Sequence, residues 1–261
     1  MNPQAPEPSA ETPTEPSVFD IRLQPAALSA PLRWLRLGWR DFMRAPAIGL
    51  FYGGSFALMG WLLLLLFQRA PAYVLALSAG FLLVGPFMCL GLYDVSRKLE
   101  RGDKPTLLAS LTCWRTRTGT MAIFGGVLLI LEMLWGRASL IVFALSFDGM
   151  PDFKGSLLAL LDPENLSFIV AYLAVGGLFA GLIFAISVVA MPMILDRQTD
   201  AISAGLTSIR LCLSQPGLML LWGALITLLV VAAMLPWFAG LLVVGPLLGH
   251  ASWHAYRATV A

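Results

Sequence analysis

The chain has 261 residues, of which 58% are hydrophobic and 12% are charged, whereas an ordinary soluble domain has about 45–50% and about 25%. This balance excludes most soluble folds, and the mean hydropathy of +0.80 indicates that lipid is the main solvent. The formal net charge of +2 is too small for a nucleic-acid-binding protein, which needs clustered basic residues to neutralise phosphates. We therefore expect an all-α, polytopic membrane protein.

The N-terminal segment differs in composition from the rest of the chain. It is rich in Pro and Glu, and it contains neither the basic region nor the apolar region of a cleavable signal peptide. Such a composition buries too little apolar surface to offset the entropy cost of ordering. We therefore expect a disordered cytoplasmic tail over residues 1–25, followed by a helical membrane domain over residues 26–261.

The first element of that domain is a predicted amphipathic helix over residues 32–44. At about 100° per residue, its arginines fall within one narrow arc and its apolar residues fall within the opposite arc. The arginines are Arg33, Arg36, Arg40 and Arg44, and the apolar residues are Leu32, Leu35, Trp39, Phe42 and Met43. Such a helix lies in the cytoplasmic interface, with its arginines against anionic lipid headgroups. A solvated connector is the alternative. Weaker patterns over 107–117 and 201–213 occupy equivalent positions.

Six apolar stretches are each near the length of about 20 residues that a helix needs to cross the hydrocarbon core. They cover residues 48–67, 73–93, 120–145, 166–195, 218–234 and 237–253. We expect them to form three membrane hairpins. Most basic residues then fall on one side, so the positive-inside rule places both termini in the cytoplasm.

Matched segments indicate an internal repeat. One offset aligns the second span with the sixth, and a second offset aligns the segment before the first span with the segment before the fifth. The matches are Val84-Gly85-Pro86 with Val244-Gly245-Pro246, Tyr93 with Trp253, Arg97 with Arg257, Arg40 with Arg210, and Pro46 with Pro216. The fourth span ends comparably, with Val188-Val189-Ala190-Met191-Pro192. We therefore predict a parallel threefold repeat, whose unit is one interfacial helix plus one hairpin.

Proline lies in the later part of each even-numbered span. Pro86, Pro192 and Pro246 each remove one backbone hydrogen bond, which favours a kink that neighbouring helices or water must compensate. The kinked spans either surround a central cavity or pack more closely. The sequence is compatible with both arrangements.

Two charged residues lie well inside a predicted span. Glu132 and Arg137 would each cost about 2.5–3.5 kcal/mol at the bilayer centre, so each should face protein, water or a partner charge. One interpretation is a proton or ion relay. The other is that Arg137 extends to the outer interface while Glu132 is hydrogen-bonded within the bundle.

The two histidines, His250 and His254, are spaced four residues apart, which places both rings on one face of a helix. A zinc site needs at least a third protein ligand, and no candidate can be named from the sequence. A single axial histidine would be sufficient for haem. The alternatives are an interfacial anchor together with Trp, Tyr and Arg, a metal or haem site, and a pH-sensing pair.

Several segments resemble one bacterial family of integral membrane proteins, catalogued as domain of unknown function 2189. They include Leu37-Gly38-Trp39-Arg40-Asp41-Phe42, Gly85-Pro86, Gly91-Leu92-Tyr93-Asp94-Val95-Ser96-Arg97, Leu99-Glu100-Arg101-Gly102, and Gly249-His250 through Arg257. Some members carry the label cytochrome c oxidase subunit I, which implies a respiratory link. This chain has too few histidines and spans for a haem-copper oxidase core. The resemblance implies a bacterial inner-membrane protein and assigns no residue roles.

No catalytic set can be assembled from the sequence, because no GxSxG motif occurs and neither histidine has a neighbouring carboxylate. We therefore expect a protein that is not an enzyme, an accessory or scaffold that acts through membrane lipids and through another membrane protein or respiratory complex. We expect no cofactor and no nucleic-acid partner. The alternatives are a small transporter or channel that uses Glu132 and Arg137, and a haem- or metal-binding respiratory accessory protein.

Overall fold

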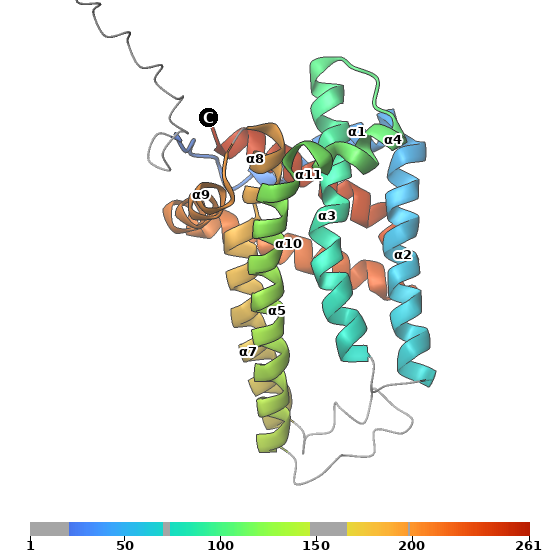
Figure 1. Ribbon diagram of the computed structural model, residues 1–261, viewed down its shortest axis with the longest axis vertical. Helices are drawn as coiled ribbons and strands as arrows, with labels where there is room; N and C mark the ends of the chain where they lie inside the picture. The colour runs from blue at the N-terminus through green and yellow to red at the C-terminus, as the bar shows by residue number, and fades with distance from the viewer. Residues whose placement is uncertain (1–20, 70–73, 147–165, 198) are drawn as a thin grey trace, which may run out of the picture.

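The computed structural model describes residues 21–69, 74–146, 166–197 and 199–261. Most of these residues are helical, with no β-strand among them and one isolated bridge between Leu23 and Val260. The helices are Ala30–Arg44 (α1), Pro46–Arg69 (α2), Val74–Arg101 (α3), Leu107–Thr112 (α4), Cys113–Arg117 (η2, a 3-10 helix), Thr118–Ser146 (α5), Leu166–Ser187 (α7), Ala190–Asp196 (α8), Ala201–Ser214 (α9), Pro216–Met234 (α10) and Leu241–Thr259 (α11). Figure 1 shows α2, α3, α5 and α7 with their axes roughly aligned, and α1, α4, α8 and α9 gathered at one end of these helices.

Four helical stretches of the described residues are long and apolar enough to cross a membrane. They are Pro46–Leu66, Leu107–Ser146, Leu166–Asp196 and Pro216–Met234. The all-helical, polytopic character predicted from the sequence is therefore confirmed. The division into six spans and three repeated hairpins remains a prediction, and helices also lie over 107–117 and 201–214, where interfacial helices are expected.

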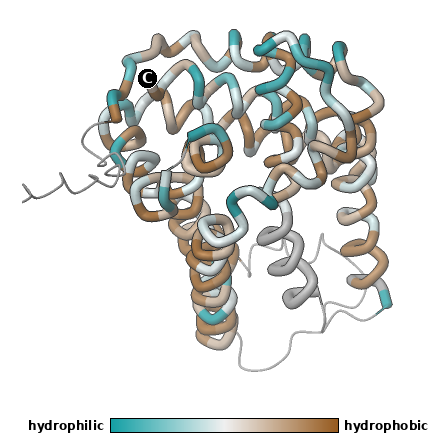
Figure 2. Tube along the Cα trace, turned by 45° about the horizontal axis from the view of Figure 1, so that its top comes forward, coloured by the Kyte–Doolittle hydropathy of each residue, from teal (hydrophilic) through white to brown (hydrophobic). Residues whose placement is uncertain are grey.

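Large apolar side chains are exposed along the parallel helices. Leu145 of α5 and Leu173 and Leu178 of α7 are all exposed, and α7 contains no buried residue. The main core lies instead at the end that carries α1, where Trp34 packs edge-to-face against Trp222 at 5.4 Å between ring centroids. Figure 2 shows hydrophobic residues along the parallel helices and hydrophilic residues gathered at that end. Lipid-facing helices produce this distribution, because hydrocarbon replaces water as their solvent.

Two helix breaks have nearly the same backbone geometry. Ala45 separates α1 from α2 with φ −135° and ψ 55°, and Gln215 separates α9 from α10 with φ −133° and ψ 57°. A proline follows each of these residues and begins the next helix. Proline disfavours the α conformation in the residue before it, and its fixed φ suits the first helical position. Pro46 and Pro216 therefore set equal turns between a shorter and a longer helix.

The predicted span over 166–195 is broken into α7 and α8. Pro192 lacks an N–H, and its ring clashes with the carbonyl four residues earlier, at Val188. Helix α7 ends just before that position. The N–H of Val189 donates to Ser208 Oγ of α9 at 3.4 Å, so a neighbouring helix compensates the break.

The other two predicted kink prolines lie inside helices that continue through them. Pro86 is within α3, and Pro246 is within α11. Pro246 leaves the carbonyl of Leu242 without its usual helical donor. That carbonyl lies against Gly53 of α2, so closely that a Cβ at position 53 would overlap it. The proline and the glycine together allow α2 and α11 to cross with their backbones nearly in contact.

The turn between α10 and α11 lies beside the middle of α2. The indole N–H of Trp61 donates to the carbonyl of Trp237, and the ring of Phe238 covers Gly60. Trp237 and Phe238 have φ of 54° and 63°, a left-handed conformation that interrupts the helix. Helix α11 therefore begins at residue 241, later than the predicted span over 237–253. The turn that precedes α11 lies beside α2 at a point about 12 Å before the end of α2.

Most of the predicted tail, residues 1–20, lies outside the described residues. Residues 21–25 are packed against the end of α11 and against α9. Ile21 is buried, and its carbonyl accepts a hydrogen bond from Arg210 at 2.9 Å. Gln24 N donates to Thr259 O at 2.9 Å. Residues 21–25 of the predicted tail are therefore packed against helices in the structure.

Candidate functional site

Helix α1 has three faces in the structure, whereas the sequence predicts two. One face, with Trp34, Gly38 and Asp41, is buried, and a Cβ at Gly38 would overlap the backbone of α11. The second face carries the exposed apolar residues Leu32 (67% exposed), Trp39 (47%) and Met43 (53%). The third face carries the four arginines, which are exposed. We call the second face the apolar stripe.

The predicted apolar face thus divides between protein and surroundings. Phe42 is buried and stacks on Trp39, with 5.6 Å between the ring centroids and 27° between the ring planes. Leu35 is half-buried and packs against the core. The apolar stripe keeps its exposure because α11 covers the neighbouring face of α1 and not the stripe itself.

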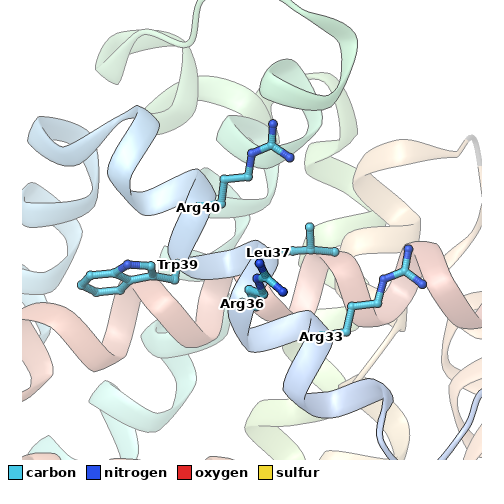
Figure 3. Close-up of a pocket in the computed structure, with 5 residues that line it drawn as sticks. All are labelled: Arg33, Arg36, Leu37, Trp39 and Arg40. Atoms are coloured by element: carbon cyan, nitrogen blue, oxygen red, sulfur yellow. The ribbon is translucent and has the colours of Figure 1, made fainter.

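A surface depression lies on the arginine side of α1. It is lined by Arg33, Arg36, Leu37, Trp39 and Arg40. Figure 3 shows the guanidinium groups of Arg33 and Arg40 extending in the same direction, with Leu37 between them. Within the described part of the chain, no carboxylate forms an ion pair with these three arginines. The depression is therefore a concentrated positive site beside the apolar stripe.

A buried polar cluster lies where α1, α3 and α11 meet. His254 Nε2 and Asp41 share a hydrogen bond of 2.8 Å, and Ser96 Oγ and His250 Nδ1 share another of 2.8 Å. Asp41, Ser96 and His250 are buried. His250 Nε2 has no hydrogen-bond partner among the described residues. The i, i+4 spacing of the histidines thus gives each ring a different neighbouring helix.

The carboxylate of this cluster is held in its charged form. Burial acts to raise the pKa of Asp41, but the hydrogen bond and the electrostatic attraction from His254 outweigh burial. Ser96 and His250 contribute in the same direction, and the pKa of Asp41 lies below its ordinary value. The cluster thus connects α1 to α11 through a charge-assisted hydrogen bond.

Three arginines connect the ends of α3, α8 and α11 in a cycle. Arg97 of α3 donates to the carbonyl of Leu195 in α8 at 2.8 Å. Arg197, which follows α8, donates to the hydroxyl of Tyr256 in α11 at 2.9 Å. Arg257 of α11 donates to Glu100 Oε1 of α3 at 3.2 Å, which closes the cycle. We call these three residues the arginine ring.

Acidic and aromatic residues support the ring. Tyr256 donates its hydroxyl proton to Asp196 Oδ2 at 3.0 Å, and Trp253 donates its indole N–H to Glu100 Oε2 at 3.0 Å. Burial, followed by the nearby Asp196 carboxylate, raises the pKa of Tyr256, so its hydroxyl keeps its proton. The C-terminal ends of these three helices are therefore held together by polar contacts.

The two charged residues predicted inside a span are in different environments. Glu132 is buried and shares the packed stripe of α5 with Leu128 and Ser139, whereas Arg137 is exposed. The Oε2 atom of Glu132 has no hydrogen-bond partner among the described residues. No ion pair joins Glu132 to Arg137 in this described region. Residues five apart point to different sides of a regular helix, which explains why these two side chains do not pair.

No group of three or more His, Cys, Asp or Glu side chains in the described residues could hold a metal ion. His250 and His254 are joined instead to Ser96 and Asp41. Sequence reasoning missed both of these partners. A signal for Asp41 exists, because at about 100° per residue it lies outside the arginine arc of its own helix. Ser96 has no comparable signal.

Residues 74–196 match the model of a family described as predicted integral membrane protein (DUF2189). This match confirms the family resemblance, and it covers α3 through α8, with Arg97 and Glu132. Helices α1 and α11 lie outside it. Comparison with curated proteins gives no significant match, and neither does comparison with solved structures. The chain is an integral membrane protein with several apolar helices.

Proposed function

We propose that this integral membrane protein, related to the DUF2189 family, is a non-enzymatic scaffold in the bacterial inner membrane. It has three parallel units, each with an interfacial helix followed by a membrane hairpin, and both termini are cytoplasmic. It acts through contacts with anionic lipids and with another membrane protein. The observation that carries this proposal is α1, whose exposed apolar stripe adjoins exposed arginines.

Two features support the threefold arrangement. The breaks at Ala45 and Gln215 have the same backbone angles to within 2°, so two of the units turn equally from the interfacial helix into the hairpin. The arginine ring then connects the last helix of each unit to the next, in the order α3, α8, α11. Three related units arranged about a common axis would produce such a cycle.

Charge distribution supports the proposed orientation. The arginine ring and the arginine face of α1 lie at the same end of the bundle, because Asp41 and His254 join α1 to α11 there. The end of α2 that carries Arg69 lies at the opposite end (Figure 1). Basic residues are retained on the cytoplasmic side during insertion, which supports a cytoplasmic location for the α1 end.

The surface of α1 supports a lipid-facing role. An interfacial helix needs an apolar side at the level of the acyl chains and a cationic side at the level of the headgroups. On α1, Leu32, Trp39 and Met43 provide the first side, and the arginines provide the second. The remaining face is fixed to α11, so α1 is held at one depth relative to the bundle.

Site-directed spin labelling in anionic liposomes tests this proposal. Labels are placed at positions 32, 43 and 33 of the full chain, after its three native cysteines have been replaced by alanine. We expect labels at 32 and 43 to be accessible to oxygen and protected from a water-soluble nickel complex, whereas the label at 33 is accessible to nickel. Position 173 on α7 is the lipid reference, and exposed position 103 is the water reference. Equal nickel accessibility at 32, 33 and 43 would make α1 a solvated connector and refute the proposal.

A second candidate function is a small transporter or channel, and Glu132 favours it. A buried carboxyl group without a partner among the described residues is costly in a membrane, so such residues are commonly functional. Flux of protons and cations into proteoliposomes should then fall in Glu132→Gln and remain in Arg137→Gln. Absence of flux in the wild-type protein would remove this candidate. Flux that is unaffected by Glu132→Gln would exclude Glu132 from the path.

A further inference from the structure

We infer that the depression on α1 is a binding site for a phospholipid with two phosphate groups, of the cardiolipin type. The inference rests on the proposed function, because it specifies the lipid that the interfacial helix binds. The site consists of Arg33, Arg36 and Arg40, with Leu37 and Trp39 as its apolar walls.

The charge of the depression suits more than one phosphate. Its three guanidinium groups carry three positive charges, and no described residue neutralises them through an ion pair. A single phosphodiester supplies one negative charge and leaves most of this charge unmatched. A lipid with two phosphodiesters supplies two charges from one molecule, so the second phosphate binds without a second loss of translational freedom.

The spacing of the arginines also suits two phosphates. Arg33 and Arg40 are seven residues apart, about 10 Å along the helix axis, and Arg36 lies between them. Guanidinium groups hold phosphate oxygens with two parallel hydrogen bonds, so neighbouring arginines can share a phosphate. The two ends of the depression therefore each provide a phosphate position, and Arg36 is within reach of both.

The apolar part of the lipid has a defined place. Trp39 lines the depression and also belongs to the apolar stripe with Leu32 and Met43. Phosphates bound by the arginines would thus direct acyl chains along the stripe, with the Trp39 ring at the glycerol level where aromatic side chains are favoured. A free phosphate or diphosphate ion would use only the arginines, so we assign the site to a lipid.

Arg44 provides a matched control. It lies on the same arginine face of α1 and is also exposed, but it does not line the depression. Replacing any of these four arginines by Gln removes one positive charge from an exposed position. General attraction between a basic helix and an anionic membrane predicts equal effects from all four changes, whereas a defined site predicts unequal effects.

The test is lipid binding by the full-length protein in detergent, measured by native mass spectrometry and by titration. Cardiolipin is compared with phosphatidylglycerol at equal total negative charge. We expect tighter binding of cardiolipin, and a loss of about tenfold in Arg33→Gln, Arg36→Gln and Arg40→Gln, as expected for one charge-assisted contact. Arg44→Gln should lose less than about twofold, since only long-range attraction changes.

Other outcomes separate this inference from the proposed function. Equal losses in all four variants, with no preference for cardiolipin, would refute the defined site and leave a general lipid-facing helix. Binding of soluble diphosphate as tight as that of cardiolipin would show that the ligand is a free anion and overturn the lipid assignment. Unchanged lipid binding in every variant would overturn both the site and the lipid-binding role of α1.

Discussion

Asp41 of α1 and His254 of α11 are 213 residues apart in the chain, and they share a hydrogen bond of 2.8 Å. Together with Gly38, which lies against the backbone of α11, this pair fixes α1 to α11. The position of the arginine face relative to the bundle therefore depends on a contact that does not involve the arginines.

Asp41→Ala should lower the free energy of unfolding by about 1–3 kcal/mol, because it leaves His254 without its partner in a mostly buried position. Thermal unfolding of the purified protein in detergent measures the change. Asp103→Ala removes an exposed carboxylate and is the control, with an expected change below about 0.5 kcal/mol. Equal midpoints for the two variants would mean that the pair contributes nothing to stability.

The contribution of Asp41 should depend on pH. Its pKa lies below the ordinary value in the folded protein, so the stabilisation is complete above the unfolded pKa of about 3.9 and is lost as the pH falls through the folded pKa. The difference in unfolding midpoint between wild type and Asp41→Ala should therefore be full at neutral pH and should shrink as the pH falls below the unfolded pKa of about 3.9. A difference that is constant over this range would contradict the assigned charge state of Asp41.

Gly53→Ala should destabilise the protein by about 1–3 kcal/mol, because its Cβ would overlap the carbonyl of Leu242 and separate α2 from α11. Gly54→Ala is the matched control, since a Cβ there meets only a Leu242 methyl group at 3.9 Å. Alanine favours the helix at both positions, so the control should be neutral or stabilised. Thermal unfolding compares the pair, and similar midpoints would disprove the close crossing.

Asp200→Ala should cost about 1 kcal/mol through the loss of a helix cap. Asp200 Oδ1 accepts hydrogen bonds from the N–H groups of Ile202 and Ser203, each at 2.8 Å, at the start of α9. Asp200→Asn retains an acceptor at the same place and should retain most of the stability. If Asp200→Asn were as unstable as Asp200→Ala, charge rather than capping would explain the effect.

The sequence predicts the arginine face of α1 but not its buried face. Periodicity alone predicts its arginine arc and its end at Arg44, and the helix begins at Ala30, two residues before the predicted start. Its buried face does not follow, because Gly38 and Asp41 are not apolar and their role arises only through contact with α11. A pattern within one helix cannot identify a partner about 200 residues later in the chain.

The polar residues at the helix ends illustrate the same limit. The match between Arg97 and Arg257 is visible in the sequence, but their acceptors, Leu195 and Glu100, lie on other helices. Arg197 completes the ring, but it does not follow Pro192 at the distance at which Arg97 follows Pro86 and Arg257 follows Pro246. Alignment of the segments on their prolines therefore does not detect Arg197. Similar residues can be found by comparing segments, whereas a cycle of contacts exists only in three dimensions.

The attachment of α1 to α11 also sets the timing of assembly. At about 5–20 residues per second, Asp41 leaves the ribosome roughly 10–40 s before His254. During that interval the face of α1 that carries Trp34, Gly38 and Asp41 has no α11 to cover it. The buried face of α1 can therefore be covered only after α11 has been synthesised, and a chain interrupted before α11 leaves the Asp41 carboxylate without its His254 partner.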